Sequence, residues 1–213
     1  MGPHTGAVGT VSAADDPKTL VEAWLRRAVV GHGLCPYAKA PLDQGRVRVE
    51  AVRAKDPLAL VARIDEAARW LVVRGAQVVE TTLLACDEPW LDFEALLDVL
   101  GLADRHLHEV GLDGAVQLVG FHPAYRFEGA PAEDPANATN RAPVPVVQLL
   151  RRASVAAAAA EGDPEAVWRR NVAYLRRLGS ARARALYDRA ALTREPEAAG
   201  RDPGPGPGDP AAS

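Results

Sequence analysis

The sequence predicts an α/β or α+β fold, in which a small mixed sheet of three to four strands is covered by helices within a single domain. Three segments rich in branched apolar residues have the length of strands, and they lie between segments whose apolar residues recur at helical spacing. This alternation favours parallel or mixed strands joined by right-handed crossovers. The chain has 213 residues, 48% of them hydrophobic, which is enough for one buried core.

The first predicted helix begins at Asp16-Pro17, a typical helix N-terminus. Its apolar residues recur at three- and four-residue spacing and are Leu20, Val21, Trp24, Ala28 and Val29. The segment HGLCP at 32–36 ends this helix, because Gly33 permits a left-handed cap and Pro36 cannot continue a helix. The segment RVRVEAV at 46–52 alternates charged residues with valine, which predicts a strand with one polar face.

The middle of the chain contains two more helices and two more strands. Asp56-Pro57 caps a predicted helix that runs to about Arg74. The segment VVETTLLAC at 78–86 is mostly apolar and branched, which is typical of a buried strand. A helix is predicted over 89–110, and the segment GAVQLVGF at 114–121 is the third predicted strand.

The last part of the chain predicts two helices and a tail. The segment PVVQLLRRASVAAAAA at 145–160 is predicted to be one helix, and 163–178 another. We expect an N-terminal disordered tail over 1–15, a domain over 16–180, and a helix end followed by a Pro/Gly-rich disordered tail over 181–213.

Charge and composition exclude several classes of protein. The net charge of −3 provides no basic field for a phosphate backbone, so we expect no nucleic-acid partner. No apolar run reaches the roughly 18–20 residues that cross a bilayer, so we expect no membrane insertion. Cys35 and Cys86 are too few for a disulfide framework, which favours free thiols in a soluble cytoplasmic protein.

The segment 122–145 follows the third predicted strand and is about 24 residues long without a clear element, which is typical of a functional loop. Ligands of open sheets bind at such strand ends. Its imidazole, phenol and carboxylate groups suit acid–base chemistry, and its guanidinium groups suit an anion. The candidate catalytic residues are His122, Tyr125 and Glu128, and the candidate substrate-binding residues are Arg126, Asp134, Asn140 and Arg141.

Each of these residues also has a structural interpretation. His122-Pro123 is also expected at a turn that ends a strand. Tyr125 and Phe127 would then attach the loop to the core, and Arg141 would pair with Asp134 or Glu128 as a latch inside the loop. The sequence leaves both interpretations open.

Cys35 also has two interpretations. It is either a small buried thiol at a helix end or a nucleophile, redox thiol or soft metal ligand. A cysteine at the carboxyl end of a helix is not activated, whereas the amides of a new turn beginning at Cys35 would lower its pKa. Cys35 and His122 with a carboxylate suit zinc or iron, although their spacing does not establish proximity. Cys86 is predicted to lie in the core.

Three segments resemble the signature blocks of the DUF1415 family, a domain of unknown function. They are WLRRAVVGHGLCPYAKAP, VETTLLACD and FHPAYRFEGAPAEDPANATNRAPVPVVQLLRRAS, and the resemblance spans about residues 17–156. It implies a set of motif residues, which adds Lys39 to the substrate-binding candidates, but it implies no reaction. The chain departs from the family pattern at Ala142, Val144, Gln148 and Arg152, where serine, an aromatic residue, histidine and glutamate are usual.

Together these residues predict an uncharacterised enzyme that acts on a small, polar, anionic molecule. His122 would be the acid–base, Cys35 a nucleophile or ligand, Arg126 and Arg141 the anion clamp, and Asn140 an orienting group. One alternative is a non-catalytic protein that binds a metal or another ligand through Cys35 and His122. Another is a structural or interaction protein. The enzyme prediction requires the loop and Cys35 to converge on one cavity.

Overall fold

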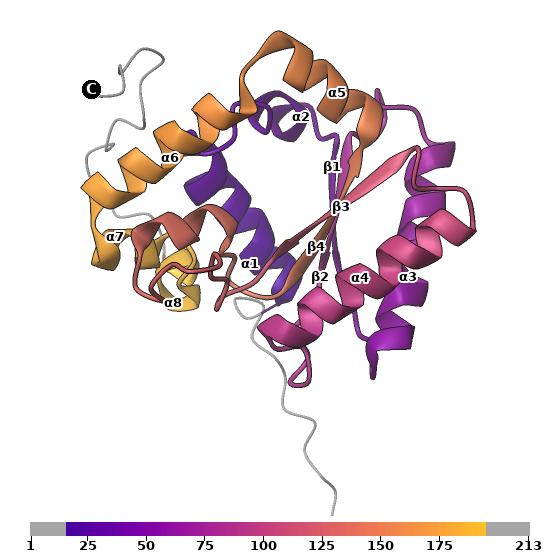
Figure 1. Ribbon diagram of the computed structural model, residues 1–213, viewed down its shortest axis with the longest axis horizontal. Coiled ribbons are helices and arrows are strands. Elements are labelled where there is room, and N and C mark those ends of the chain that lie inside the picture. Colours follow the sequence, from indigo (N-terminus) through magenta and orange to yellow (C-terminus); the bar gives the residue numbers. More distant parts are fainter. Residues whose placement is uncertain (1–15, 195–213) are drawn as a thin grey trace, which may run out of the picture.

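The computed structural model describes residues 16–194 and is built on a four-stranded mixed sheet (Figure 1). The strands are β1 (Val47–Ala51), β2 (Thr81–Ala85), β3 (Val116–Phe121) and β4 (Val146–Arg151), in the order β1-β2-β4-β3. β1 and β2 are parallel, and β4 is antiparallel to both of its neighbours. The predicted mixed sheet covered by helices is therefore confirmed, as an α+β fold.

Two long helices cover one face of the sheet, α3 (Pro57–Val73) and α4 (Phe93–Glu109) (Figure 1). Each begins where an aspartate accepts a hydrogen bond from a backbone N–H of the first turn, Asp56 from Ala59 at 2.8 Å and Asp92 from Ala95 at 2.9 Å. Their apolar faces pack on the sheet in one core cluster. The largest fully buried side chains of that cluster are Leu60, Ile64, Leu71, Leu84, Leu96, Val99, Leu107 and Leu149.

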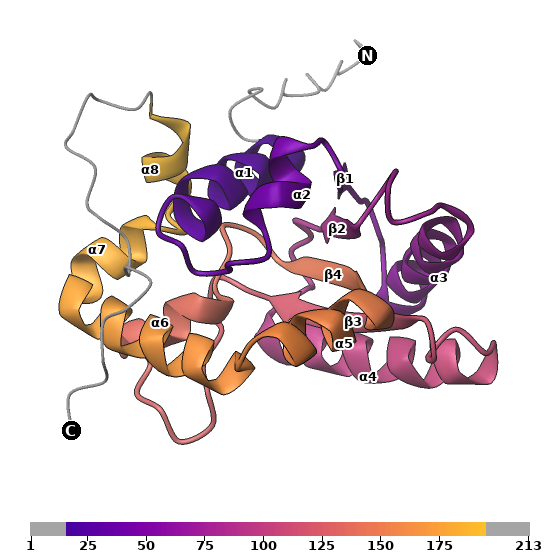
Figure 2. The same cartoon turned by 90° about the horizontal axis from the view of Figure 1, so that it is seen from above.

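Shorter helices cover the other face (Figure 2). They are α1 (Pro17–Trp24), which continues as the π-helix η2 (Leu25–Val30), then α6 (Pro164–Leu178), α7 (Ser180–Ala185) and α8 (Arg189–Thr193). Trp24 contacts Phe121 of β3 edge to face, with ring centroids 5.3 Å apart. These helices pack on the sheet in a second core cluster, which contains both Trp24 of α1 and Leu192 of α8. The helical layer therefore extends beyond residue 180. The predicted tails over 1–15 and beyond Arg194 lie outside the described residues.

The prediction of one helix over 145–160 is wrong in its first half. This segment forms β4 and then α5 (Arg152–Glu161). β4 pairs with β2 and β3 along its two edges, and helices cover both of its faces: Val147 and Leu149 face α3 and α4, and Val146 faces α1. A strand that is apolar on both faces does not alternate, and periodicity alone cannot distinguish it from a buried helix.

Two short elements lie in segments where no element was predicted, α2 (Lys39–Asp43) and the 3₁₀ helix η3 (Pro135–Asn140). The other predicted strands and helices are confirmed, with their ends shifted by a few residues. Within residues 16–194, no helix combines the length and apolar character needed to cross a membrane.

Candidate functional site

Cys35 and His122 lie toward opposite ends of the sheet. His122 follows Phe121, whose β4 partner Val146 also pairs with Ala85 at the end of β2. Cys35 lines a cavity with Thr81 and Leu150, which pair with each other at the other end of the same two strands. At about 3.3 Å per residue, the length of a strand separates the two ends.

This separation corrects the prediction of a shared site. The cavity lined by Cys35 does not include His122. The structure therefore does not bring together the two side chains proposed as ligands for zinc or iron. Among the described residues, no group of three or more His, Cys, Asp or Glu side chains is arranged to hold a metal ion.

Both ring nitrogens of His122 are engaged inside the protein. Nε2 donates to the carbonyl oxygen of Leu91 at 3.2 Å, and Nδ1 accepts the backbone N–H of Ala124 at 3.0 Å. The ring is buried beside Phe93, with the ring centroids 5.8 Å apart, and this burial lowers the pKa of His122. The geometry is that of a neutral ring that caps a turn and ties it to the segment before α4.

Arg141 is a latch of the 122–145 loop, but its partners differ from the predicted carboxylates. Its guanidinium donates to the carbonyl oxygens of Tyr125 and Ala132, both at 2.8 Å, and to the hydroxyl of Tyr187 at 2.7 Å. These bonds engage all three nitrogens of the guanidinium, which holds Arg141 in the loop and leaves fewer N–H donors for a substrate anion.

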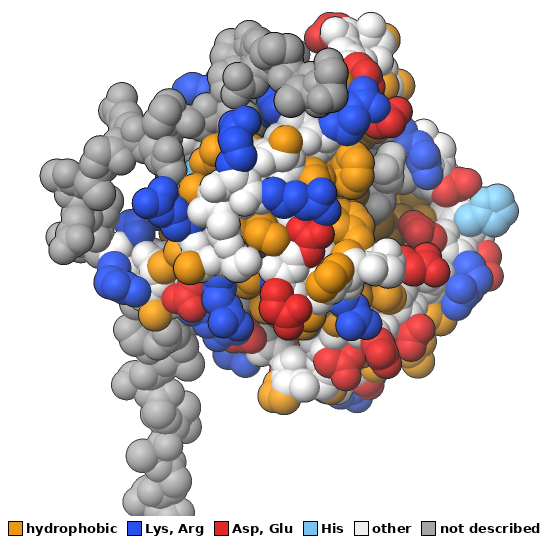
Figure 3. Space-filling view, turned by 60° about the vertical axis from the view of Figure 1, so that its left-hand side comes forward, with side chains coloured by type: hydrophobic (Ala, Val, Ile, Leu, Met, Phe, Trp, Pro, Cys, Tyr) orange, Lys and Arg blue, Asp and Glu red, His pale blue; other side chains and the backbone are white. Residues whose placement is uncertain are grey.

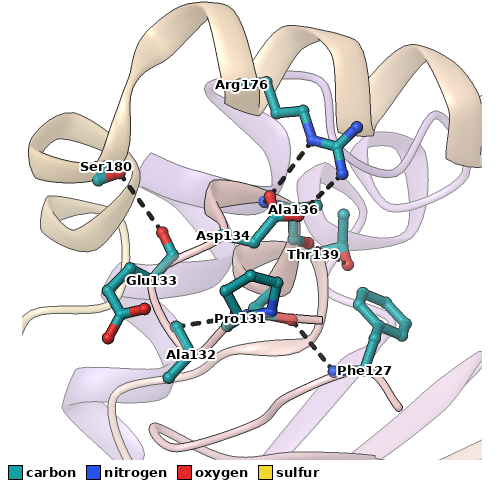
Figure 4. Close-up of polar contacts among 10 residues, drawn as sticks. Phe127, Pro131, Ala132, Glu133, Asp134, Ala136, Thr139, Arg176 and Ser180 are labelled. Carbon is teal, nitrogen blue, oxygen red and sulfur yellow. Dashed lines mark hydrogen bonds and ion pairs between the residues drawn. The ribbon is translucent and has the colours of Figure 1, made fainter. Parts of the chain in front are cut away.

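Asp134 connects the loop to α6 (Figure 4). Its carboxylate accepts from the backbone N–H of Ala136 at 2.9 Å, at the start of η3, and pairs with Arg176 at 2.8 Å. Ser180 bonds the neighbouring carbonyl oxygen of Glu133 at 3.4 Å. Figure 3 shows basic and acidic side chains interspersed over this side of the molecule.

The Asp134–Arg176 pair predicts acid sensitivity. The hydrogen bond from Arg176 lowers the pKa of Asp134, with help from the N–H of Ala136. A lowered folded-state pKa stabilises the protein above the unfolded value of about 3.9, and that stability is lost as the pH falls through the folded value. We therefore expect Asp134→Asn to lose stability at neutral pH and to differ less from wild type at a pH below the lowered folded-state pKa of Asp134, where the wild-type carboxyl is protonated too. Urea unfolding at several pH values measures this, and a gap that widens toward acid would contradict it.

Asn137 is the residue of the loop that the sequence analysis missed. It is fully buried, and its Oδ1 accepts the backbone N–H of Phe127 at 3.1 Å. Its Nδ2 donates to the carbonyl oxygens of Pro131 at 2.9 Å and Ala132 at 3.4 Å. In the sequence the only local signal is an asparagine between two alanines, Ala136 and Ala138, whose burial the structure reveals. Asn137 thus replaces water as the partner of three loop backbone groups.

Asn140 is also engaged within the loop. Its side-chain oxygen accepts from the hydroxyl of Thr139 at 2.9 Å, and its carbonyl oxygen accepts the backbone N–H of His122 at 3.2 Å. Lys39 is not part of this region: it lies exposed on α2 and pairs with Asp43. The predicted substrate-binding residues are therefore dispersed or engaged with the loop itself.

A chain of aromatic rings attaches the loop to α4 and α6. Tyr125 contacts Phe93 with centroids 5.2 Å apart and Phe127 with centroids 5.1 Å apart, and Phe127 reaches Trp168 at 6.5 Å. Burial raises the pKa of Tyr125. The exposed side chains of Arg126 and Glu128 border an open hollow beside these rings, of about 560 Å³.

A second cavity lies between α2, α5 and the sheet, and it contains Cys35. Its volume is about 280 Å³, and most of its lining is apolar. The polar residues among the lining are Cys35, Tyr37, Glu80, Thr81, Gln148 and Ser154. α5 forms its roof with Ser154, Val155 and Ala158, and buries none of its side chains fully. Small side chains on this helix leave the volume open.

Cys35 lies directly before a turn over 36–38 that leads into α2. Burial raises the pKa of its thiol, and the backbone N–H groups of Tyr37 and Ala38 oppose this. The interpretation of Cys35 as the start of a new turn is therefore correct, but burial outweighs the amides. The thiol is protonated at neutral pH.

The segment before Cys35 is fixed by α6. Asn171 donates to the carbonyl oxygen of Leu34 at 2.6 Å, and Arg170 donates to that of Gly33 at 2.8 Å. On the opposite wall, Gln148 Nε2 donates to Thr81 Oγ1 at 3.1 Å, and Thr81 Oγ1 donates to the carbonyl oxygen of Leu149 at 2.8 Å. The cavity thus has rigid walls on both sides.

Residues 17–185 match the family model described as protein of unknown function, DUF1415. The chain belongs to the DUF1415 family. The match extends beyond the segment over which the sequence blocks resemble the family. No significant match is found among curated proteins or among solved structures.

The motif positions of this DUF1415 protein fall into two places in the fold. Cys35, Glu80 and Thr81 line the cavity, whereas His122 and Arg141 hold the loop together. Gln148, at a position where the resemblance described above implies a histidine, also lies in the cavity wall. Motif side chains therefore border open volume in this cavity, as Tyr125 and Glu128 do at the hollow beside the aromatic rings.

Proposed function

We propose that this protein binds a small, mostly apolar molecule in the cavity beside Cys35. The observation that carries the proposal is a mostly apolar cavity of about 280 Å³ with a few polar side chains in its wall. Small-molecule sites in proteins have this character: an apolar lining gives affinity, and a few fixed polar groups give orientation. This volume is near the small end of the range, which favours a compact ligand.

The proposal replaces the expected anionic ligand with an uncharged one. Among the described residues that line the cavity, none is Lys, Arg or His. The one carboxylate in the lining, Glu80, pairs with Arg46 at 3.1 Å. An anion in this cavity would lose water without gaining a cationic partner, which is unfavourable.

Binding rather than catalysis is the role that the geometry supports. The Cys35 thiol has a raised pKa, and the described lining offers no imidazole or amine to remove its proton. His122, Tyr125 and Glu128, the other predicted catalytic residues, lie outside this lining. We also propose that the protein works in the cytoplasm, since Cys35 and Cys86 are both free thiols.

Filling the cavity tests the proposal. We expect wild-type protein to bind 2-methylnaphthalene, a compact apolar probe, and Ala158→Phe to bind it at least about tenfold more weakly, because the new ring occupies the volume that the probe needs. Fluorescence titration of the probe measures the affinities. Ala157→Phe is the matched control, since Ala157 is exposed on the same helix and does not line the cavity.

The site of binding is checked through Cys35. Occupancy by the probe is expected to slow alkylation of Cys35 by iodoacetamide at alkaline pH, where the thiolate forms. Mass spectrometry of the modified peptide measures this rate. Equal affinities in wild type and Ala158→Phe, or an alkylation rate unaffected by the probe, would exclude this cavity as the binding site.

A further inference from the structure

The wall of the Cys35 cavity contains hydrogen bonds that fix the direction of one amide. Thr81 is buried, and its hydroxyl has a single hydrogen, which it donates to the carbonyl oxygen of Leu149 at 2.8 Å. Thr81 Oγ1 can then act toward Gln148 only as an acceptor. The contact of 3.1 Å between them is therefore made by the Nε2 donor of Gln148.

This order of donors leaves Gln148 Oε1 without a partner among the described residues, and it leaves the second hydrogen of Nε2 free as well. Gln148 is partly exposed and belongs to the lining of the cavity, so its oxygen is not enclosed by the core. A carboxamide oxygen accepts hydrogen bonds and cannot donate them. A ligand with only acceptors at this end could use the second hydrogen of Nε2, but it would leave Oε1 unpaired.

Two other polar side chains of the lining are less restrictive. The hydroxyl of Ser154 and the thiol of Cys35 can each donate or accept. A ligand hydroxyl suits Gln148, Ser154 and Cys35 alike, because it donates one hydrogen bond and can accept others. With the charge of Glu80 already matched by Arg46, the polar end of the ligand has no charge to neutralise.

We infer that the natural ligand of this cavity is an uncharged molecule with an apolar body and a hydroxyl group, an alcohol or a phenol, whose hydroxyl donates to Gln148 Oε1. The inference rests on the proposed function, since it names the class of molecule that the same cavity binds. It makes Gln148 a specificity-determining residue: the apolar walls bind the body, and Gln148 selects the donor.

A pair of probes of nearly equal size tests the inference. 2-Naphthol and 2-methylnaphthalene differ by a hydroxyl in place of a methyl group, and fluorescence titration gives the dissociation constant of each. The informative quantity is the ratio of the two constants, compared between wild type and Gln148→Leu. We expect this substitution to shift the ratio against 2-naphthol by about tenfold, because the buried hydroxyl then lacks its acceptor.

Controls separate this inference from the proposed function. Gln77→Leu, at an exposed position outside the cavity lining, should leave the ratio unchanged. Gln148→Met replaces Gln148→Leu if the latter does not fold, as judged by thermal melting. A ratio unaffected at position 148, or tighter binding of 2-naphthoate than of 2-naphthol, overturns the inference while cavity binding stands. If neither 2-naphthol nor 2-methylnaphthalene binds wild-type protein, both proposals fall.

Discussion

Replacing Asn137 with Ala is expected to lower the free energy of unfolding by about 1–3 kcal/mol, because the backbone N–H of Phe127 loses its partner and two carbonyl oxygens of the loop each lose one of their donors. The carboxamide of Asn137 serves the N–H of Phe127 and the carbonyl oxygens of Pro131 and Ala132, and the side chain is fully buried. Water cannot readily replace it at a site without exposure. The two carbonyl oxygens each keep a second donor, the N–H of Asp134 for Pro131 at 3.1 Å and the guanidinium of Arg141 for Ala132 at 2.8 Å. The unpaired N–H of Phe127 therefore accounts for most of the cost, since a buried backbone group left unpaired costs about 1–3 kcal/mol. Urea unfolding followed by circular dichroism measures the change.

Asn140 is the matched control for this prediction. It lies three residues away on the same 3₁₀ helix, is partly exposed, and uses its side-chain oxygen to accept one hydrogen bond from Thr139. Asn140→Ala is therefore expected to cost about 1 kcal/mol or less. Equal effects at the two positions would mean that Asn137 is not the organising residue of the loop.

The sequence predicted most of the fold because most elements carry a single clear signal. α3 and α4 have capping aspartates and an apolar stripe, and β2 is a short apolar run bounded by polar residues. β4 was missed because a strand covered on both faces has no alternation, and the alanines of α5 directly after it suggested one continuous helix. Whether this segment forms a strand or a helix is decided by its pairing with β2 and β3, and the residues of the segment alone do not encode that pairing.

The candidate site was predicted less well, for two physical reasons. The polar residues of the 122–145 loop were interpreted as groups free to bind a substrate, but a long loop must satisfy its own backbone, and Arg141, Asn137 and Asp134 do so. The cavity arises from unfilled volume under α5, where the side chain of Ala158 is small. A run of alanines in the sequence predicts a helix. Whether that helix also leaves a cavity depends on the distance between it and the sheet, which the sequence does not give.

The neighbouring threonines of β2 give the second large expected effect, with opposite signs at adjacent positions. Thr82 is fully buried, and its Oγ1 has no hydrogen-bond partner among the described residues. Thr82→Val removes an unpaired polar atom and keeps the shape of the side chain. We expect it to stabilise the protein by about 1–2 kcal/mol, which corresponds to a rise in melting temperature of roughly 2–4 °C per kcal/mol for a domain of this size.

Thr81→Val makes the same atomic change on the other face of the strand and is expected to destabilise by about 1–2 kcal/mol. Thr81 Oγ1 donates to the carbonyl oxygen of Leu149 and accepts from Gln148, so both partners lose a bond. Calorimetric melting of both variants measures the two shifts. A threonine-to-valine change also alters strand propensity and side-chain volume. Because both substitutions make the same change in the same strand, the difference between them reports on the hydrogen bonds of the hydroxyl. Destabilisation by both substitutions would show that the Thr82 hydroxyl is paired in solution, and the buried wall behind β2 would then have to contain an acceptor or a water molecule.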